Sequence, residues 1–150
     1  MKLISPAFEQ GGKIPAKYTC DGENINPPLT ISDVPSEATS LVLIMEDPDV
    51  PKSLRADGMW DHWIVFNMPP DLTKIEEGRE PQGIHGIGTG DNLDYYGPCP
   101  PDREHRYFFK LYALDTQLNL PEKSTKQQIE RAMENHILAK TELMGRYERI

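Results

Sequence analysis

Apolar residues along this chain gather in short runs that prolines and glycines separate. Three nearly continuous runs, residues 40–46 (SLVLIME), 62–68 (HWIVFNM) and 107–114 (YFFKLYAL), predict buried strands. Residues 29–34 predict a weaker strand, and the alternation in residues 141–147 (TELMGRY) predicts another. The 14 prolines and 11 glycines leave little room for long helices, so we expect structured loops between these strands.

The segment of residues 124–140 (STKQQIERAMENHILAK) has a different period. Ile129, Met133 and Ile137 recur at every fourth position, which predicts one apolar stripe along an amphipathic helix. Ser124 is the residue that we expect to cap this helix at its N-terminus.

These elements predict a mainly β fold, a sandwich of antiparallel sheets with short helices and one C-terminal amphipathic helix. At 150 residues, of which 37% are hydrophobic, the chain is long enough for one globular domain over residues 1–150. Its formal net charge of −8 argues against nucleic-acid binding and against an anionic membrane surface. The N-terminus (MKLISPAFEQ) has no apolar leader, and no window reaches the length of a membrane span, so we expect a cytoplasmic protein.

The chain has two cysteines, Cys20 and Cys99. Neither belongs to a CxxC motif, so the sequence predicts neither a zinc site nor a thioredoxin-like site. In a reducing compartment we expect two free thiols. A disulfide between them is the alternative, because both flank proline- and glycine-rich loops that can meet.

Polar residues stand at the ends of the predicted strands. Asp47 and Asp49, in the segment DPDVP, follow the first apolar run at spacing i, i+2, so in an extended chain their side chains point the same way. His62 begins the second run, and His105 and Tyr107 stand at the head of the third. A strand-ending turn explains DPDVP alone. The recurrence of carboxyl, imidazole and phenol groups at three strand boundaries favours a binding site.

Two loops carry further signals. Residues 95–101 (YYGPCPP), the proline loop, place three prolines in four positions and form a rigid connector before the third strand. Residues 86–90 (GIGTG) are a weak candidate for a phosphate cradle, because they lack the strand–turn–helix context of such loops. His136 falls off the apolar stripe of the predicted helix, and we expect it on the surface or facing a dimer partner.

Four segments in this order and spacing, DPDVP, HWIVFNMP, YYGPCPP and HRYFFKLYALD, resemble the phosphatidylethanolamine-binding protein family, which includes the Raf kinase inhibitor proteins. The segment IPAKYTCDGENINPPL resembles its bacterial and archaeal branch. The resemblance implies two antiparallel sheets with a small anion-accepting pocket at one end, no metal or other cofactor, and a homodimer. It also implies a sharp turn with a cis peptide between Val50 and Pro51. The matching motif positions give these pocket residues: Asp47, Asp49, Pro51, His62, Gly97, Pro98, His105 and Tyr107.

The sequence departs from the family pattern beside this pocket. Arg103 stands where the pattern has a glycine, two residues before the histidine of HRY. The loops before Tyr95 and between Pro101 and His105 are shorter than in typical bacterial members. We expect these changes to leave the base of the pocket intact and to alter its mouth, and therefore the size of the ligand.

Histidines explain how an anion site can contain aspartates. One ring nitrogen can donate to an aspartate while the other donates to the ligand, and the aspartate favours the protonated imidazole. Tyr107 adds a hydroxyl donor, and backbone N–H groups near Gly97 complete the site. This hypothesis places His105 at a strand end facing a cleft, outside the packed interior. It predicts that anion affinity falls as the pH rises past the pKa of the bound imidazolium.

The leading hypothesis is therefore a binding protein without enzymatic activity. Its partner is an anionic small molecule or a phosphorylated group, and it modulates a kinase or another signalling protein. A second hypothesis is an inhibitor of a protease or another protein that acts through a surface loop or terminus. A third is a metal-dependent hydrolase, since two aspartates and two histidines can ligate a divalent metal and activate water. No HxH or HExxH pair occurs in the sequence, which argues against the third.

Overall fold

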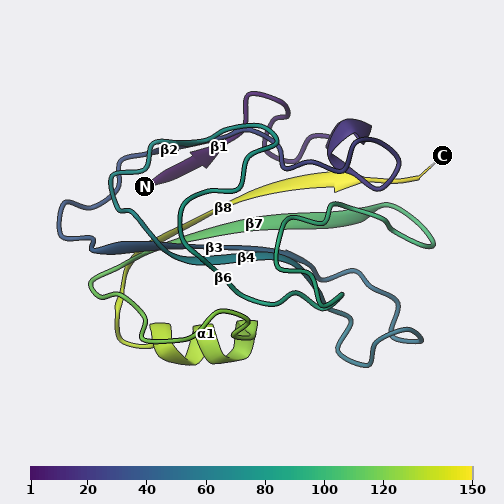
Figure 1. The fold of residues 1–150 in the computed structure, drawn as a ribbon. Coiled ribbons are helices and arrows are strands. Elements are labelled where there is room, and N and C mark those ends of the chain that lie inside the picture. Colours follow the sequence, from purple (N-terminus) through teal and green to yellow (C-terminus); the bar gives the residue numbers. More distant parts are fainter. Residues whose placement is uncertain (150) are drawn as a thin grey trace.

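Two antiparallel sheets form the structure, a computed structural model that describes residues 1–149 (Figure 1). The smaller sheet has the strand order β1-β2-β5, and the larger has the order β6-β4-β3-β7-β8. This arrangement confirms the predicted, mainly β fold of antiparallel sheets. The elements in chain order are β1 (Lys2–Ile4), the 3-10 helix η1 (Ala16–Tyr18), β2 (Leu29–Ser32), β3 (Ser40–Asp47), β4 (Trp60–Met68), β5 (Lys74–Ile75), β6 (Ile84–His85), β7 (His105–Leu114), α1 (Lys126–Met133) and β8 (Ile137–Tyr147).

The larger sheet is covered on both faces, which explains why its central strands read as continuous apolar runs. All 8 residues of β3 are buried. Leu43 and Met45 belong to the core shared with the smaller sheet, whereas Val42 and Ile44 pack with helix α1 on the opposite face. Figure 1 shows β1 and β2 over one face of the sheet and α1 against the other. These two cores fix the positions of β3, β4 and β7.

Helix α1 begins with a capping box. The cap is Thr125 and not the predicted Ser124: the Thr125 hydroxyl accepts from the backbone N–H of Gln128, whose side chain accepts from the Thr125 N–H. Ile129 and Met133 are buried against the larger sheet, as the apolar stripe predicts. Among the described residues, no helix combines the length and the apolar character needed to cross a membrane.

The predicted helix is wrong beyond Met133. Asn135 adopts a left-handed conformation with φ of 67°, and the N–H of His136 donates to the Met133 carbonyl at 2.9 Å, which closes the helix end. Ile137 then begins β8 and is 43% exposed. His136 therefore lies in the connection to β8, where its Nδ1 is 2.8 Å from Asp115 Oδ1.

The predicted cis bond between Val50 and Pro51 is wrong, because residues 1–149 contain no cis peptide. The turn closes through backbone hydrogen bonds instead. The N–H of Val50 donates to Gly58 O at 3.2 Å, and the N–H of Leu54 donates to Pro51 O at 2.9 Å. Pro51 thus supplies the carbonyl oxygen that closes this turn.

The expectation of two free thiols is also wrong, because a disulfide joins Cys20 to Cys99. The two loops that carry these cysteines are held together by further contacts. The N–H of Cys20 donates to Pro98 O at 3.1 Å, and the N–H of Gly97 donates to Asn24 Oδ1 at 2.8 Å. The proline loop is therefore tied to the N-terminal loop.

Candidate ligand-binding site

One end of the larger sheet carries a cavity with a volume of about 260 Å³. Strands β4 and β7 flank β3 and both run antiparallel to it, so the C-terminal end of β3 lies between their N-terminal ends. The proline loop supplies another wall. The lining residues are Asp47, Val50, Leu54, Trp60, His62, Tyr96, Cys99, Pro100, Pro101, His105 and Tyr107.

This set divides the predicted site residues into two groups. The cavity is lined by Asp47, His62, His105 and Tyr107, and it is not lined by Asp49, Pro51, Gly97 and Pro98. The apolar part of the wall, which includes Leu54, Trp60 and Tyr96, is missing from the prediction, because these residues carry no polar motif. The strand-end positions therefore predict the polar residues of the cavity better than its walls.

Asp49 points toward Arg106 and not into the cavity. Its Oδ2 accepts from the backbone N–H and from Nε of Arg106 at 2.8 and 2.9 Å, and its Oδ1 accepts from Nη2 at 2.8 Å. These bonds lower the pKa of Asp49. The chain turns directly after Asp47, whose Oδ1 accepts from the Asp49 N–H at 2.7 Å. The extended geometry assumed for the two aspartates is therefore wrong.

Gly97 supports the cavity wall without offering a donor to a ligand. Its N–H already donates to Asn24, so the prediction of a free backbone donor there is wrong. A Cβ at this position would lie 2.0 Å from Tyr18 O, which means that only glycine fits between the two loops. The next carbonyl, that of Pro98, accepts from Cys20. Both predicted residues thus hold the proline loop in place.

His62 is a neutral hydrogen-bond acceptor in the cavity wall. Its Nδ1 donates to the carbonyl oxygen of Tyr96 at 2.7 Å, which fixes the tautomer with the proton on Nδ1. Burial lowers the pKa of His62 to about 4. At about 1.4 kcal/mol for each pH unit, protonating this ring at pH 7 costs roughly 4 kcal/mol. Nε2 has no protein partner within residues 1–149, so it remains an acceptor at neutral pH.

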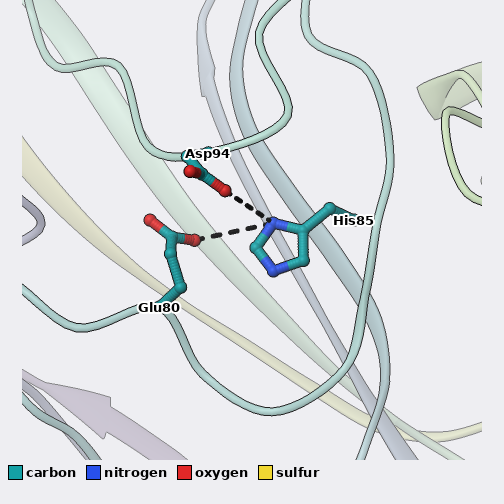
Figure 2. Close-up of side chains that lie close together, drawn as sticks. All are labelled: Glu80, His85 and Asp94. Carbon is teal, nitrogen blue, oxygen red and sulfur yellow. Dashed lines mark ion pairs between the residues drawn. The ribbon is translucent and has the colours of Figure 1, made fainter.

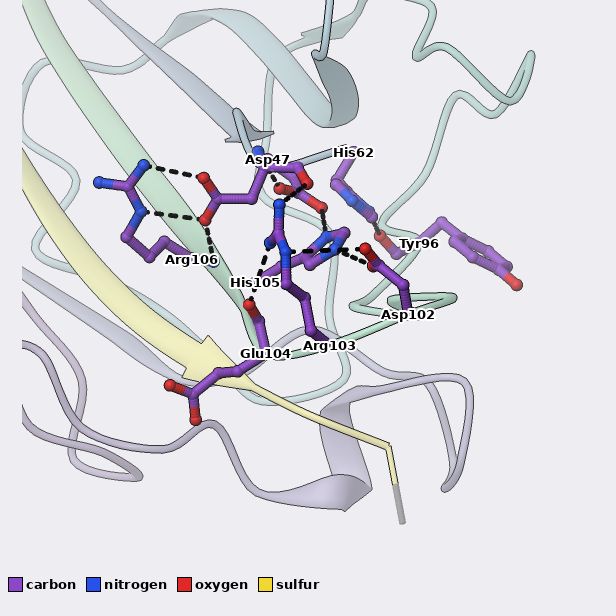
Figure 3. A network of polar contacts seen from close by, with 9 residues as sticks. Asp47, His62, Tyr96, Asp102, Arg103, Glu104, His105 and Arg106 are labelled. Atoms are coloured by element: carbon purple, nitrogen blue, oxygen red, sulfur yellow. Dashed lines mark hydrogen bonds and ion pairs between the residues drawn. The ribbon is translucent and has the colours of Figure 1, made fainter. Parts of the chain in front are cut away.

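His105 lies between two carboxylates (Figure 3). Its Nδ1 is 2.6 Å from Asp47 Oδ2, and its Nε2 is 2.6 Å from Asp102 Oδ1. While both carboxyl groups are ionised, each of them requires a donor, so both nitrogens carry a proton and the ring is positive. His105 lines the cavity from a strand end, as predicted, but it is 0% exposed and both of its nitrogens face carboxylates, so neither nitrogen is free for a ligand in this structure. Sequence reasoning missed Asp102, whose only signal is its place three residues before His105.

The two carboxylates that flank His105 differ in their surroundings. Burial raises the pKa of Asp47, and the hydrogen bonds from His105 and from the Asp49 N–H oppose this only in part. At Asp102 burial also acts to raise the pKa, but the bonds from His105 and from the Arg103 backbone outweigh it and lower the pKa. The Asp47 side chain is 4% exposed and that of Asp102 is 39% exposed. Asp47 is thus the enclosed partner of His105, and Asp102 is the accessible one.

The Tyr107 hydroxyl is buried without a hydrogen-bond partner among the described residues. Burial raises the pKa of Tyr107 well above its usual value, and the nearby Asp47 carboxylate adds to this through its charge and by attracting the hydroxyl hydrogen, so the phenol keeps its proton. Its ring meets that of His62 edge-on, with the centroids 5.4 Å apart. A buried donor without an acceptor costs about 1–3 kcal/mol. The cavity therefore offers a hydrogen-bond donor beside the His62 acceptor.

The family model of the phosphatidylethanolamine-binding proteins matches residues 4–148. The chain belongs to the phosphatidylethanolamine-binding protein family. A UPF0098 protein of Chlamydia pneumoniae is 54% identical over 149 residues, which are 99% of each chain. A UPF0098 protein of Methanothermobacter thermautotrophicus is 49% identical, again over 99% of each chain. These relatives fit the bacterial and archaeal branch that the N-terminal segment resembles.

Solved structures of the family share this fold. The crystal structure of CT736 from Chlamydia trachomatis, described as a phosphatidylethanolamine-binding protein homolog, has a TM-score of 0.96 at 52% identity and covers 99% of this chain and 97% of its own. Escherichia coli YbcL, described as a member of the mammalian family, has a TM-score of 0.88 at 26% identity, with coverages of 99% and 98%. Membership in this family supports a ligand-binding protein.

In this member of the phosphatidylethanolamine-binding protein family, the glycine-rich residues 86–90 are not a phosphate cradle. The backbone N–H groups of Gly86, Ile87, Gly88 and Thr89 donate to the carbonyl oxygens of Ile64, Ser124, Asn92 and Asp61. Because these amides are already paired within the protein, they do not face a ligand.

A second polar cluster of this family member, formed by Glu80, His85 and Asp94, lies outside the cavity lining (Figure 2). His85 Nδ1 donates to Leu93 O at 2.8 Å and lies 3.6 and 3.5 Å from carboxylate oxygens of Glu80 and Asp94. The three side chains offer ligand atoms within 4.8 Å of one another. Glu80 also accepts from the Tyr95 N–H at 3.0 Å, so this cluster helps to place the start of the proline loop.

Proposed function

We propose that the cavity binds a small oxyanion that still carries a proton, such as the monoanion of a phosphomonoester, and that the protein acts by binding and not by catalysis. The supporting observation is the buried Tyr107 donor beside the neutral His62 acceptor. A phosphomonoester monoanion has an oxygen that accepts from the Tyr107 hydroxyl and a P–OH group that donates to His62 Nε2. The Tyr107 hydroxyl and His62 Nε2 then each have a hydrogen-bond partner on the ligand.

This proposal replaces the imidazolium hypothesis for His62. A fully ionised anion has no proton for Nε2, and its charge would meet the Asp47 carboxylate nearby. The positive ring of His105 does not change this balance, because each of its nitrogens already faces a carboxylate. The cavity therefore favours a ligand that brings its own proton.

The walls of the cavity indicate an apolar group on the ligand. Leu54 and Tyr96 are 64% and 43% exposed, and both line the cavity together with Trp60. Exposed large apolar side chains around a small pocket are typical of a surface that a ligand covers. We therefore expect an ester with an aromatic or aliphatic group to bind more tightly than inorganic phosphate.

Phenyl phosphate and phenyl sulfate test the role of the ligand proton. The second pKa of a phosphomonoester is about 6, so near pH 5.5 most of the phenyl phosphate carries the P–OH group. Its affinity should fall by up to about tenfold for each pH unit above that pKa, because the bound form must retain the proton. Phenyl sulfate has a similar size and no proton, and should bind at least about tenfold more weakly near pH 5.5. Titration calorimetry measures both.

Tyr107→Phe is the matched variant for this experiment. It removes one hydroxyl that has no hydrogen-bond partner within residues 1–149, so the free energy of unfolding should stay the same or rise. Its binding of phenyl phosphate should be weaker by roughly 1.5–3 kcal/mol of free energy, the range for a hydrogen bond to a charged group. His136→Ala, which changes an exposed ring outside the cavity, should bind like wild type. Equal affinities for the phosphate and the sulfate at every pH would contradict the proposal.

The remaining hypotheses have less support. The hydrolase hypothesis needs the aspartates and histidines of the strand ends as metal ligands, yet Asp49 faces Arg106 and both nitrogens of His105 face carboxylates. Modulation of a kinase, inhibition of a protease, homodimer formation and a cytoplasmic location rest on the sequence alone. We therefore put only small-ligand binding forward.

A further inference from the structure

Asp102 makes a contact that the proposed ligand would also make. Its Oδ1 lies 2.6 Å from His105 Nε2, so an oxygen with a negative charge already accepts from this nitrogen (Figure 3). A bound oxyanion would offer the same kind of acceptor. His105 also lines the cavity, and its ring centroid is 6.4 Å from that of Tyr107. An oxyanion bound at the Tyr107 hydroxyl would therefore lie in the same cavity as the His105 ring.

The position of Asp102 shows from which side it reaches His105. A hollow of about 290 Å³ on the surface is lined by Pro100, Pro101, Asp102, Arg103, Glu148 and Arg149. Pro100 and Pro101 line both this hollow and the cavity, whereas Asp102 lines the hollow alone. Asp102 thus approaches His105 from outside, past the two prolines.

The two carboxylates on His105 differ in how easily they can leave. Asp47 is the last residue of β3, its side chain is 4% exposed, and its second oxygen accepts from the Asp49 N–H. Asp102 lies in a loop with its side chain 39% exposed, and its other oxygen lies 3.7 Å from Arg103 Nε, too far for a hydrogen bond. Water can solvate the Asp102 carboxylate once it turns away, whereas Asp47 is held at the end of β3 by its second hydrogen bond.

We propose that Asp102 is an internal competitor of the ligand: its carboxylate occupies His105 Nε2 until an oxyanion in the cavity displaces it. This inference rests on the proposed function, and it adds a residue that sets the affinity of the cavity. A carboxylate attached three residues away acts at a high effective concentration, so a simple anion exchanges one charged hydrogen bond for another with little gain. Only a ligand with further contacts, such as those to Tyr107, His62 and the apolar rim, displaces Asp102 readily.

Substitution of Asp102 tests the competition. Titration of phenyl phosphate near pH 5.5, where its monoanion dominates, should give an affinity for Asp102→Asn at least about tenfold higher than for wild type, because a neutral amide competes less well for a charged donor. Asp102→Ala, which removes the competing oxygen altogether, should bind at least as tightly as Asp102→Asn. Inorganic phosphate should gain by about the same factor as the ester, because removal of the competitor raises equally the affinity of every ligand that has to displace it.

Asp115→Asn is the matched control. It removes the same charge from another aspartate–histidine pair, since Asp115 Oδ1 lies 2.8 Å from His136 Nδ1 on the surface. Its affinity should equal that of wild type, which separates local competition from the change in net charge. Thermal unfolding of each variant shows that the binding reports on folded protein.

The outcomes separate the competition from the proposed function. If wild type binds phenyl phosphate and the Asp102 variants bind it equally well, the competition is overturned while the function of the cavity stands. If only the Asp102 variants bind, the competition is supported, and the cavity of the wild-type protein is closed to this ligand. If no variant binds either phosphate, both inferences are overturned.

Discussion

His105→Ala should lower the free energy of unfolding by about 3–5 kcal/mol, because it leaves a buried carboxylate without its charged partner. Asp47 is 3% exposed, and its bond to His105 Nδ1 is 2.6 Å long. Urea denaturation of the two proteins at neutral pH measures the difference. This large loss of stability is expected because His105 is buried. The sequence alone did not indicate this burial.

The stability that His105→Ala loses should depend on pH, because the substitution changes the pKa of Asp47. Burial already raises the pKa of Asp47, and without His105 that pKa rises further. A carboxyl group whose pKa is higher in the folded state favours folding most at low pH and loses that contribution as the pH rises through the folded-state pKa. The deficit of His105→Ala should therefore be largest at neutral pH and shrink as the pH falls toward about 4.

Two further variants control for other effects. His136→Ala breaks an exposed aspartate–histidine pair and should cost no more than about 1 kcal/mol. Asp47→Asn combined with His105→Ala should recover part of the stability lost by the single variant, because no charge is then left buried. A loss for His105→Ala no larger than that for His136→Ala would show that the buried pair does not exist in solution.

Breaking the disulfide should cost about 2–4 kcal/mol of stability. Cys20 and Cys99 are 79 residues apart in the sequence, so the bond closes a long loop and restricts the unfolded chain strongly. Cys99 also lines the cavity, and its loop carries the prolines of the cavity wall. We therefore expect the Cys20→Ala, Cys99→Ala double variant to unfold at a lower urea concentration and to bind phenyl phosphate more weakly.

A reductant provides the control for this prediction. Reduced wild-type protein should unfold at about the urea midpoint of the double variant, whereas the double variant itself should not respond to the reductant. Identical unfolding midpoints for oxidised and reduced wild type would contradict the prediction.

The strands and the polar residues of the cavity could be predicted because they depend on local patterns. Strand β3 is buried on both faces and therefore reads as a continuous apolar run. Asp47 and His62 stand at strand ends that meet in any sheet where these two strands are antiparallel neighbours. The position of such residues follows from the strand boundaries, without knowledge of individual contacts.

Features that depend on single contacts were not predictable. The direction of Asp49 depends on one hydrogen bond to Asp47 and on the guanidinium of Arg106. The second partner of His105 depends on the path of the short loop at Asp102, which no sequence period encodes. The early end of helix α1 depends on a left-handed Asn135 that is followed by a long strand. In each case tertiary contacts override the local pattern.

The protonation of the two cavity histidines decides between the proposed site and the one that the sequence implies. Within residues 1–149, His62 has one carbonyl acceptor and a nitrogen without a partner, and His105 has two carboxylates. These environments call for a neutral ring and a charged ring in the same cavity. Without a ligand, the charged ring holds Asp47 and Asp102, and the neutral ring offers Nε2 to the ligand.

Nitrogen-detected NMR of isotopically labelled histidine side chains, with and without phenyl phosphate, measures most directly which ring nitrogens of His62 and His105 carry a proton. From these contacts we expect that at neutral pH His62 is protonated on Nδ1 alone and His105 on both nitrogens. Near pH 5.5, where phenyl phosphate is mainly the monoanion, adding it should shift the Nε2 resonance of His62 as that nitrogen gains a donor. A His62 ring already protonated on both nitrogens at neutral pH, or an Nε2 resonance that does not move at saturating phenyl phosphate, would contradict the account.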